Sequence, residues 1–488
     1  MIERLQCGVA NDQAIRFASR PIRPHIMLRQ STRSPCLALL AASLGFVIIC
    51  LDVTVVNVAL GRIQQSFSVG PTELEWVLSA YTLAFAALLL SAGALGDRLG
   101  ARSVFVGGFA IFTLASVACG LAPSAAALVA ARTVQGVGAA LCVPSSLSLL
   151  NAAFPDSRTR TKAVSIWAGT AALALGAGPL VGGLLINRFG WPSIFLINVP
   201  FGVAGIWLTL AYAPDTLRNA TRRIDLAGQM LAVISLVALM FAVVESGRLG
   251  WGSPAVITGI VCFVVSAALF VLVEAWQREP MLPLSLFQIP AVSVSSAIGL
   301  SLNFGYYGLM FAMSLFFQHV RGYTPLETGL AFLPMTAVVT VANLASGALT
   351  SRFGYRLPMV AGQVLAAVGF LSLELIEVNS SYLTITAPLL AIGVGVALAV
   401  PSINTALLAH VDPRSVGIAS GLQNTARQIG GALGVGVFGS LITGAAGNPV
   451  NGLHTAVTLA GAMMVAGVVI AIARLKTAGS TARPGAAC

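Results

Sequence analysis

Charged residues are scarce in this sequence. Only 9% of its 488 residues are Asp, Glu, Lys or Arg, whereas 57% are hydrophobic and the mean hydropathy is +0.90. A soluble domain has about 25% charged residues, so a water-soluble fold of this length is excluded. Apolar runs of roughly 20 residues recur instead, the length that a helix needs to cross a bilayer. They lack the alternating segments of about 10 residues typical of transmembrane strands, and we therefore expect an all-α polytopic membrane protein.

Residues that would support nucleotide or metal chemistry are also few. Lysine occurs only at Lys162 and Lys476, and neither follows a glycine, whereas a nucleotide-binding P-loop needs Gly-Lys-Ser/Thr. The 7 cysteines form no CxxC pair and the histidines no metal-ligand cluster, which argues against a disulfide framework and a metal site. No nucleophile–base pair stands out. We therefore expect no enzyme activity, no metal and no cofactor, and any active transport would have to use an ion gradient.

The formal net charge of +11 would suit a nucleic acid partner, but the positions of the charges argue otherwise. We assign fourteen spans with the N-terminus inside, at residues 37–60, 76–96, 103–122, 125–150, 163–186, 194–213, 225–244, 255–273, 292–316, 328–350, 357–376, 383–408, 416–442 and 453–473. Most of the 27 Lys and Arg residues then fall in inner loops and tails, as the positive-inside rule describes. The sequence thus predicts a multi-pass protein of the inner (plasma) membrane, with both termini cytoplasmic and no nucleic acid partner.

Two motifs occur twice at nearly the same distance. Gly93-Ala-Leu-Gly-Asp-Arg-Leu-Gly-Ala-Arg102 returns 254 residues later as Gly347–Arg356, and Gly136–Ser145 returns 257 residues later as Gly393–Ser402. Two motifs repeated at nearly the same distance indicate a chain built from two related halves. We expect a disordered basic tail at 1–36, a six-helix bundle at 37–214, a linker with two inserted helices at 215–283, a second six-helix bundle at 284–473 and a tail at 474–488. Met1 and Met27 stay open as alternative starts of translation.

One acid, Asp52, lies well inside a predicted span. A carboxylate in hydrocarbon costs at least about 2.5 kcal/mol, so it should face a cavity or a partner. Desolvation favours its neutral form and a nearby cation its charged form, a balance that suits a group that binds and releases protons. Arg132 is the candidate partner, because both residues lie roughly 10–12 Å below the outer surface at 1.5 Å rise per residue. The alternatives are a purely structural Asp52 and an Arg132 that extends outward to water.

Other polar or small residues inside the spans are weaker candidates. Small residues in the fifth span allow close helix approach and its proline can bend the helix, which fits either a gate between the halves or ordinary tight packing; the residues are Gly178, Pro179, Gly182 and Gly183. Candidates to line a substrate cavity are Asn57, Gln135, Asn303, Tyr306, Tyr307, Asn404, Asn424, Arg427 and Gln428. Glu73 and Glu75 are expected in the outer loop that opens at Gly70-Pro71.

Several of these motifs, in this order, resemble the major facilitator superfamily, in its fourteen-helix drug:proton antiporter group. The matching stretches are Leu51–Leu60 for the first-helix motif, Gly93–Arg102 for the cytoplasmic loop, Arg132–Ala140 for the fourth-helix motif implicated in proton transfer, Gly178–Gly183 for the antiporter motif of helix five, and Phe317-Gln318. Gly61, Ala101 and Ala174 differ from the residues usual in these motifs. The resemblance implies the major facilitator fold, with two six-helix bundles and two extra central helices.

The resemblance also implies roles for the motif residues. Asp52 and Arg132 would serve proton coupling or cation binding, and the glycines and proline of the fifth span a gate. A conformational latch would be formed by Gly93, Asp97, Arg98, Gly100 and Arg102. The repeat of this turn has Ser351 in place of Asp97, so its acid is in the N-terminal half only.

The sequence therefore predicts a secondary active transporter that exports amphipathic or cationic drugs or toxic metabolites in exchange for protons, by alternating access. Two alternatives stay open, a proton symporter that imports a small solute and a non-transporting membrane sensor or scaffold. The expected partners are a small-molecule substrate, protons and the lipid bilayer. We expect a monomer, with a periplasmic adaptor as the one protein partner left open. The identity of the substrate and the proton stoichiometry do not follow from the sequence.

Overall fold

The computed structural model describes residues 34–216, 225–277, 280–411, 416–444 and 449–475. All of them belong to one compact unit, residues 32–488. The described residues form helices joined by short connections, with no strand among them, so the predicted all-α fold is confirmed. The tail at 1–36, which was expected to be disordered, and the tail at 474–488 fall almost wholly outside the described residues.

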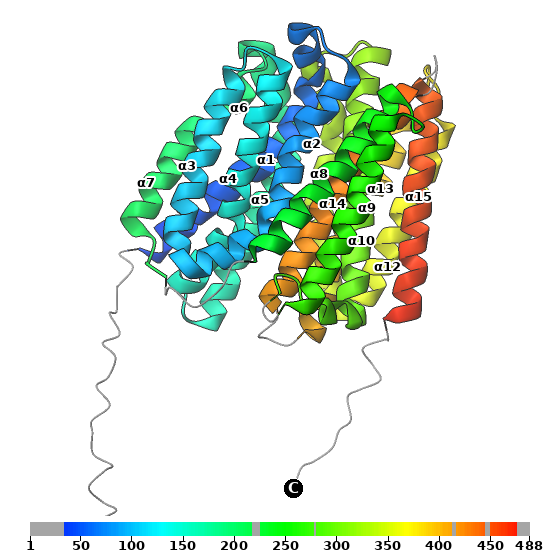
Figure 1. Cartoon of the computed structure of the whole chain (residues 1–488). Helices are drawn as coiled ribbons and strands as arrows, with labels where there is room; N and C mark the ends of the chain where they lie inside the picture. The colour runs from blue at the N-terminus through cyan, green and yellow to red at the C-terminus, as the bar shows by residue number, and fades with distance from the viewer. Residues whose placement is uncertain (1–33, 217–224, 278–279, 412–415, 445–448, 476–488) are drawn as a thin grey trace, which may run out of the picture. The chain divides into compact units, whose positions relative to one another are not determined.

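The helices follow one another in a simple order (Figure 1). The first part contains α1 (Pro35–Phe67), α2 (Pro71–Leu99), α3 (Ala101–Gly120), α4 (Ala125–Ala153), α5 (Ser157–Phe189), the short α6 (Ser193–Leu196) and α7 (Asn198–Tyr212). The middle pair is α8 (Leu226–Leu249) and α9 (Pro254–Trp276). The last part contains η1 (Leu284–Gln288), α10 (Pro290–Leu315), η2 (Phe316–Val320), α11 (Pro325–Phe353), α12 (Arg356–Ser372), η3 (Leu373–Leu375), α13 (Tyr382–His410), α14 (Val416–Gly444) and α15 (Pro449–Arg474).

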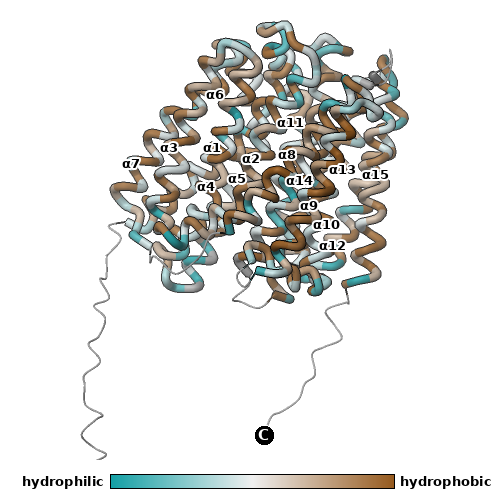
Figure 2. The backbone as a smooth tube through the Cα atoms, viewed as in Figure 1, coloured by the Kyte–Doolittle hydropathy of each residue, from teal (hydrophilic) through white to brown (hydrophobic). Residues whose placement is uncertain are grey.

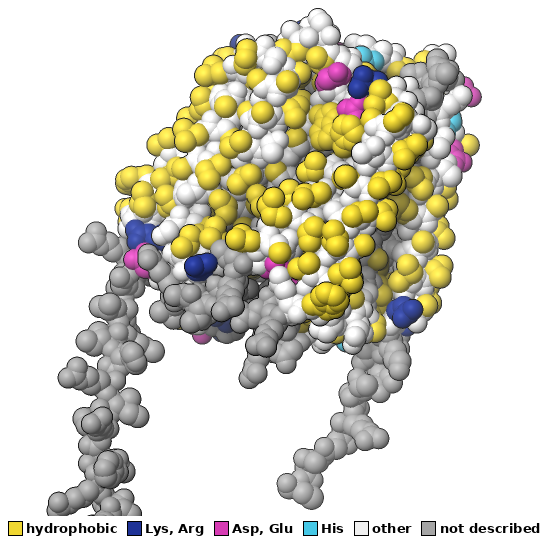
Figure 3. Space-filling model, in the orientation of Figure 1, with side chains coloured by type: hydrophobic (Ala, Val, Ile, Leu, Met, Phe, Trp, Pro, Cys, Tyr) yellow, Lys and Arg dark blue, Asp and Glu magenta, His cyan; other side chains and the backbone are white. Residues whose placement is uncertain are grey.

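Among the described helices, 13 are long and apolar enough to cross a membrane. The remaining expected span corresponds to α14, which has 29 residues. Its polar turn at Asn424–Gln428 and its many glycines lower its hydropathy, which explains why it falls outside those 13. Figure 2 shows the apolar colour along α9 and the hydrophilic colour gathered in the connections at the helix ends. Figure 3 shows hydrophobic side chains spread widely over the face in view, as expected for a surface in contact with lipid.

Figure 1 shows the described chain beginning and ending on the same side of the molecule. We call the side where α1 begins and α15 ends the terminus face, and the side where α1 ends the opposite face. The helices are longer than the predicted spans at several ends, because their first turns carry good start signals.

The clearest case is α2, which was expected to begin at residue 76. It begins at Pro71, a residue whose missing N–H costs nothing in a first turn, and the Glu73 carboxylate accepts a hydrogen bond of 3.0 Å from Gly70 N. Glu73 and Glu75 therefore lie in the helix and the expectation of a loop was wrong. Glu75 is fully buried.

Buried apolar clusters are found on both sides of the middle pair. One contains only residues between Ile48 and Ala213, and another only residues between Ala291 and Leu475. A third joins the two parts, because Phe311 and Val435 pack among side chains of α1 and α2. The main helix pairs that connect the two parts are α5 with α11 and α2 with α14, while α8 packs against both α2 and α14. The predicted bundle boundaries remain predictions.

Candidate functional site

Asp52 on α1 and Arg132 on α4 form a buried ion pair. Arg132 Nη1 donates to Asp52 Oδ2, and the two side chains are 0% and 1% exposed for Asp52 and Arg132, respectively. Taking two charges out of water is costly, and their mutual attraction compensates only where further hydrogen bonds satisfy the remaining polar atoms. Arg132, the partner that the sequence suggested for Asp52, is thus in place.

Three neutral polar side chains supply further hydrogen bonds around the buried pair. Gln135 Nε2 donates to Asp52 Oδ1 over 2.9 Å, and Gln135 Oε1 accepts from Arg132 Nη1 over 2.6 Å. Gln135 Nε2 also contacts Ser116 Oγ at 2.9 Å, and Asn198 Nδ2 donates to Asp52 Oδ1 at 3.3 Å and to Ser116 Oγ at 3.2 Å. We call these five residues the buried polar cluster. It joins α1, α3, α4 and α7, so a change in the charge of Asp52 acts on four helices.

Ser116 and Asn198 were not among the candidates from the sequence. Both are polar residues within apolar runs, the same signal that singled out Asn57. Neither residue is exposed. Their role depends on the close packing of α3 and α7 against the rest of the first part, which the sequence alone did not provide.

The Arg132 guanidinium is also held by aromatic and backbone groups. Its Cζ lies 4.2 Å from the centroid of the Tyr81 ring and 5.7 Å from that of Phe195. Arg132 Nε donates to Val77 O over 3.2 Å. Cation–π contacts of this kind are worth about 2 kcal/mol or more when desolvated. The cation is therefore fixed from α2 and α6 as well as by Asp52.

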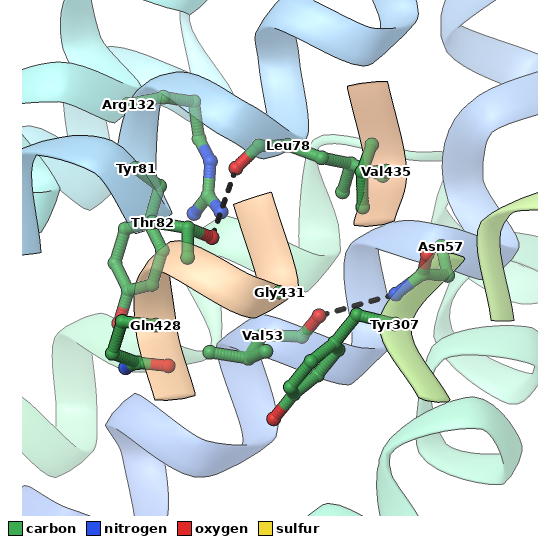
Figure 4. Close-up of a pocket in the computed structure, with 10 residues that line it drawn as sticks. All are labelled: Val53, Asn57, Leu78, Tyr81, Thr82, Arg132, Tyr307, Gln428, Gly431 and Val435. Carbon is green, nitrogen blue, oxygen red and sulfur yellow. Dashed lines mark hydrogen bonds between the residues drawn. The ribbon is translucent and has the colours of Figure 1, made fainter. Parts of the chain in front are cut away.

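A cavity lies beside this cluster, between helices of the first and last parts (Figure 4). Its lining residues are Val53, Asn57, Leu78, Tyr81, Thr82, Arg132, Tyr307, Gln428, Gly431 and Val435. In the view, Arg132 and Tyr81 lie on one side and Asn57 and Tyr307 on the other. The cavity thus has both aromatic and polar walls, and Arg132 connects it to the buried acid.

Three of the predicted cavity candidates, Asn57, Tyr307 and Gln428, line this space. The others lie elsewhere in this structure. Asn303 is buried and donates to Gly299 O over 3.1 Å, and Tyr306 belongs to the apolar core of the last part. Gln135 is in the buried polar cluster, Asn404 and Asn424 are exposed, and Arg427 packs against Gly299.

The glycines of α5 permit close contacts on two sides. A Cβ at Gly182 would lie 2.7 Å from Val55 Cγ2, and one at Gly178 would overlap Thr54, so this face of α5 lies directly on α1. A Cβ at Gly183 would lie 2.9 Å from Leu326 Cα, on α11. Helix α5, which contains Pro179, therefore connects the helix that carries Asp52 with the last part of the chain.

The repeated turn shows a matching contact in each half. Arg102 donates to Leu210 O at the end of α7 and pairs with Asp215 at 2.8 Å. Its counterpart Arg356 donates to Ile472 O, at the end of α15, over 2.9 Å. Each arginine thus ties the last helix of its own part to the turn. In the same turn Gly100 has a φ of 93° between α2 and α3, Arg98 is exposed, and Gly93 and Asp97 are half-buried. The latch role of the turn stays a prediction.

A further set of contacts joins the two parts at the opposite face. Gln318 lies in the π-helical turn η2, and its Oε1 accepts from Gly61 N at 3.2 Å while its Nε2 donates to Val58 O at 3.3 Å. Ser314 donates to Asn57 O over 2.5 Å. The group that the sequence resembles usually has proline at the position of Gly61. Proline has no backbone N–H, whereas the N–H of Gly61 donates to Gln318. Single π-helical turns are frequent at functional sites.

Comparisons with known proteins agree with this architecture. The chain matches the Major Facilitator Superfamily over residues 42–435. It is 40% identical over 402 residues to the Methylenomycin A resistance protein of Streptomyces coelicolor, covering 82% of this chain and 84% of that protein. It is also 40% identical over 410 residues to the Multidrug resistance protein Stp of Mycobacterium tuberculosis, covering 84% of this chain and 76% of the relative.

Among solved structures, the fold is similar to that of the human organic anion transporter MFSD10. The TM-score is 0.61 at 15% identity, with 90% of this chain and 99% of the other covered. At this identity the likeness concerns the fold alone. The family match, which covers most of the chain, and the two relatives together establish that the chain belongs to the Major Facilitator Superfamily, as a multi-pass membrane transporter.

Proposed function

We propose that this protein is a drug efflux transporter that exports amphipathic or cationic compounds in exchange for protons. The relatives at 40% identity are named for resistance to methylenomycin A and to multiple drugs. The observation that carries the proposal is the fully buried Asp52–Arg132 pair, of which Arg132 also lines a cavity between the two parts. A buried acid in contact with the wall of a substrate cavity allows the proton and the substrate to influence each other.

The charge balance of the site gives the coupling a sign. With Asp52 ionised, the pair is neutral overall and the cavity tolerates a cation. Protonation of Asp52 leaves Arg132 with an uncompensated positive charge. Two unit charges 4 Å apart interact with about 4 kcal/mol at an effective dielectric constant of about 20. A proton on Asp52 thus disfavours a cationic substrate in the cavity, which is the exclusion that antiport requires.

The remaining expectations from the sequence form part of the same proposal. The terminus face is cytoplasmic, because most of the Lys and Arg residues fall on that side. Export then runs from the terminus face to the opposite face of the inner membrane, by movement of the two parts around the central cavity. The protein acts as a monomer, without enzyme activity or a cofactor, and a periplasmic adaptor is the protein partner to look for.

The test is transport in proteoliposomes with an imposed pH gradient. The wild-type protein should move a fluorescent cationic dye against its gradient, and collapse of the pH gradient should abolish the movement. Asp52→Asn should lose gradient-driven movement, whereas Glu377→Gln, at an exposed acid on the opposite face, should retain it. Full gradient-driven transport by Asp52→Asn would refute the role of Asp52, and transport insensitive to the pH gradient would refute proton coupling.

A further inference from the structure

A second acid, Glu75, is buried within the membrane domain without a hydrogen-bonding partner. It lies in the second turn of α2 and is 0% exposed. Neither of its carboxylate oxygens has a hydrogen bond within the described part of the chain. This contrasts with Asp52, both of whose oxygens are bonded. A buried and unpartnered carboxylate is costly when ionised and is far easier to bury as the neutral acid.

The contact that buries Glu75 crosses between the two parts. A Cβ at Gly439 of α14 would lie 2.7 Å from Glu75 Cγ, so the side chain is pressed against the α14 backbone. A larger side chain at position 439 would displace the Glu75 side chain from this place. Helices α2 and α14 are one of the two main pairs that connect the parts. Separation of the parts at the opposite face would therefore bring water to this carboxyl group.

The charged groups near Glu75 do not offer it a counterion. Those that act on it electrostatically are Glu245 on α8 and Glu73 on its own helix, and both are acids. The nearest cation of α8, Arg248, is engaged by the Glu245 carboxylate, with bonds of 2.9 and 3.2 Å. Trp76 Nε1 also donates to Glu245, over 3.2 Å.

The other elements around this end of α2 do not supply a counterion either. Arg132 of α4 is turned toward Asp52 and Val77 O. On α1, Arg62 is exposed, and on η2, His319 contacts Gln64 at 2.5 Å and shares a cavity wall with Pro71. Residues 430–444 of α14, which face this end of α2, include no titratable side chain. The titratable side chain near the end of α3 is that of Cys119.

We propose that Glu75 is a second proton-binding site, separate from the buried polar cluster, that holds a proton while the two parts are in contact at the opposite face. Separation of the parts there hydrates the carboxyl group and lets it ionise. Return to the packing seen here requires that Glu75 take up a proton again. Because the contact state binds one proton more than the separated state, acid pH favours contact and alkaline pH favours separation.

In an exporter, proton binding at Glu75 would let protons enter from the side to which the substrate is released, and this role in transport rests on the proposed function. Its test does not, because it measures the distance between the two parts rather than transport. Spin labels are placed at Gln65→Cys on α1 and Asn379→Cys between η3 and α13, both exposed at the opposite face. The cysteines outside the buried set, Cys7, Cys36, Cys262 and Cys488, are replaced by serine.

The purified full chain in lipid nanodiscs is measured by double electron–electron resonance from pH 5 to pH 9. In the otherwise wild-type protein, the population with a long label-to-label distance should grow as the pH rises. Glu75→Gln, which imitates the protonated acid, should lose this growth and keep the short distance throughout. Glu75→Leu is also permanently neutral and should behave in the same way. Agreement between the two variants excludes a folding defect specific to one of them.

The matched control is Glu73→Gln, two residues away, which should keep the pH-dependent change in distance. Asp52→Asn should also keep the pH-dependent change, so a failure of the proposed transport mechanism would be distinguishable from a failure of this proposal. The proposal is overturned if the wild-type distances do not depend on pH, if both Glu75 variants still respond to pH, or if Glu73→Gln abolishes the response as Glu75→Gln does.

Discussion

Replacing Arg132 by methionine should strongly destabilise the protein, and the structure allows the loss to be sized. Methionine keeps much of the side-chain length but removes the cation, which leaves Asp52 buried at 0% exposure without a counterion. Removing one partner of a buried pair costs about 3–5 kcal/mol. The variant also loses the contact to Val77 O and the stacking on Tyr81, so we expect a loss at the upper end of that range.

A double-mutant cycle separates the ion pair from these other contacts. Asp52→Leu alone should also lose about 3–5 kcal/mol, because it leaves Arg132 as the uncompensated charge. The double variant Asp52→Leu with Arg132→Met buries no charge at the pair and should lose less than the sum of the single losses. The difference is the coupling energy of the pair, which for residues in one network is about 0.5–3 kcal/mol.

The measurement is the free energy of unfolding by a denaturing detergent, followed by Trp fluorescence in mixed micelles. Arg188→Met at the opposite-face end of α5 is the matched control, since this arginine is exposed and should cost little. Additive losses in the cycle, or a loss from Arg132→Met as small as that from Arg188→Met, would show that the ion pair does not hold α1 to α4.

Three further predictions concern other parts of the structure. Gly182→Val should cost about 1–3 kcal/mol by overpacking against Val55 and slow transport, while Gly169→Val, in the same helix with open space around it, should do neither. Gln318→Ala should raise the population separated at the opposite face in the label experiment, with Arg188→Ala as the exposed control. The hydrogen bond from the Thr159 backbone N–H lowers the pKa of Asp156, the N-cap of α5. The stabilisation that ionised Asp156 gives the folded protein is therefore present above the ordinary pKa of an aspartate and is lost as the pH falls through the lowered pKa. Asp156→Ala should reduce the acid sensitivity of thermal unfolding.

Much of the fold could be predicted from the sequence, because the physical constraint is strong. A helix that crosses hydrocarbon must satisfy its own backbone hydrogen bonds, so long apolar runs allow few alternatives. The ion pair between Asp52 and Arg132 was accessible by the same logic, from equal depth and opposite charge. The start of α2 was not, because the Pro71 and Glu73 start signals were interpreted as a loop.

The details of the site depended on packing that single-sequence reasoning does not reach. Asn198 reaches Asp52, and Ser116 reaches Asn198 and Gln135, only because α7 and α3 pack against the first part in a particular register. Among the cavity candidates, Tyr307 faces the cavity and its neighbour Tyr306 faces the core, a difference set by helix rotation. The burial of Glu75 likewise depends on Gly439, which lies 364 positions later in the sequence.

The most direct test of the account is the release of protons when a cationic drug binds to the purified protein in weakly buffered detergent solution. If Asp52 must ionise before the cavity accepts a cation, drug binding should release protons from the wild-type protein. Asp52→Asn should bind the drug with little or no proton release, and Glu377→Gln should behave as the wild type does. Equal proton release by Asp52→Asn and the wild type would contradict the central claim that Asp52 couples the proton to the substrate.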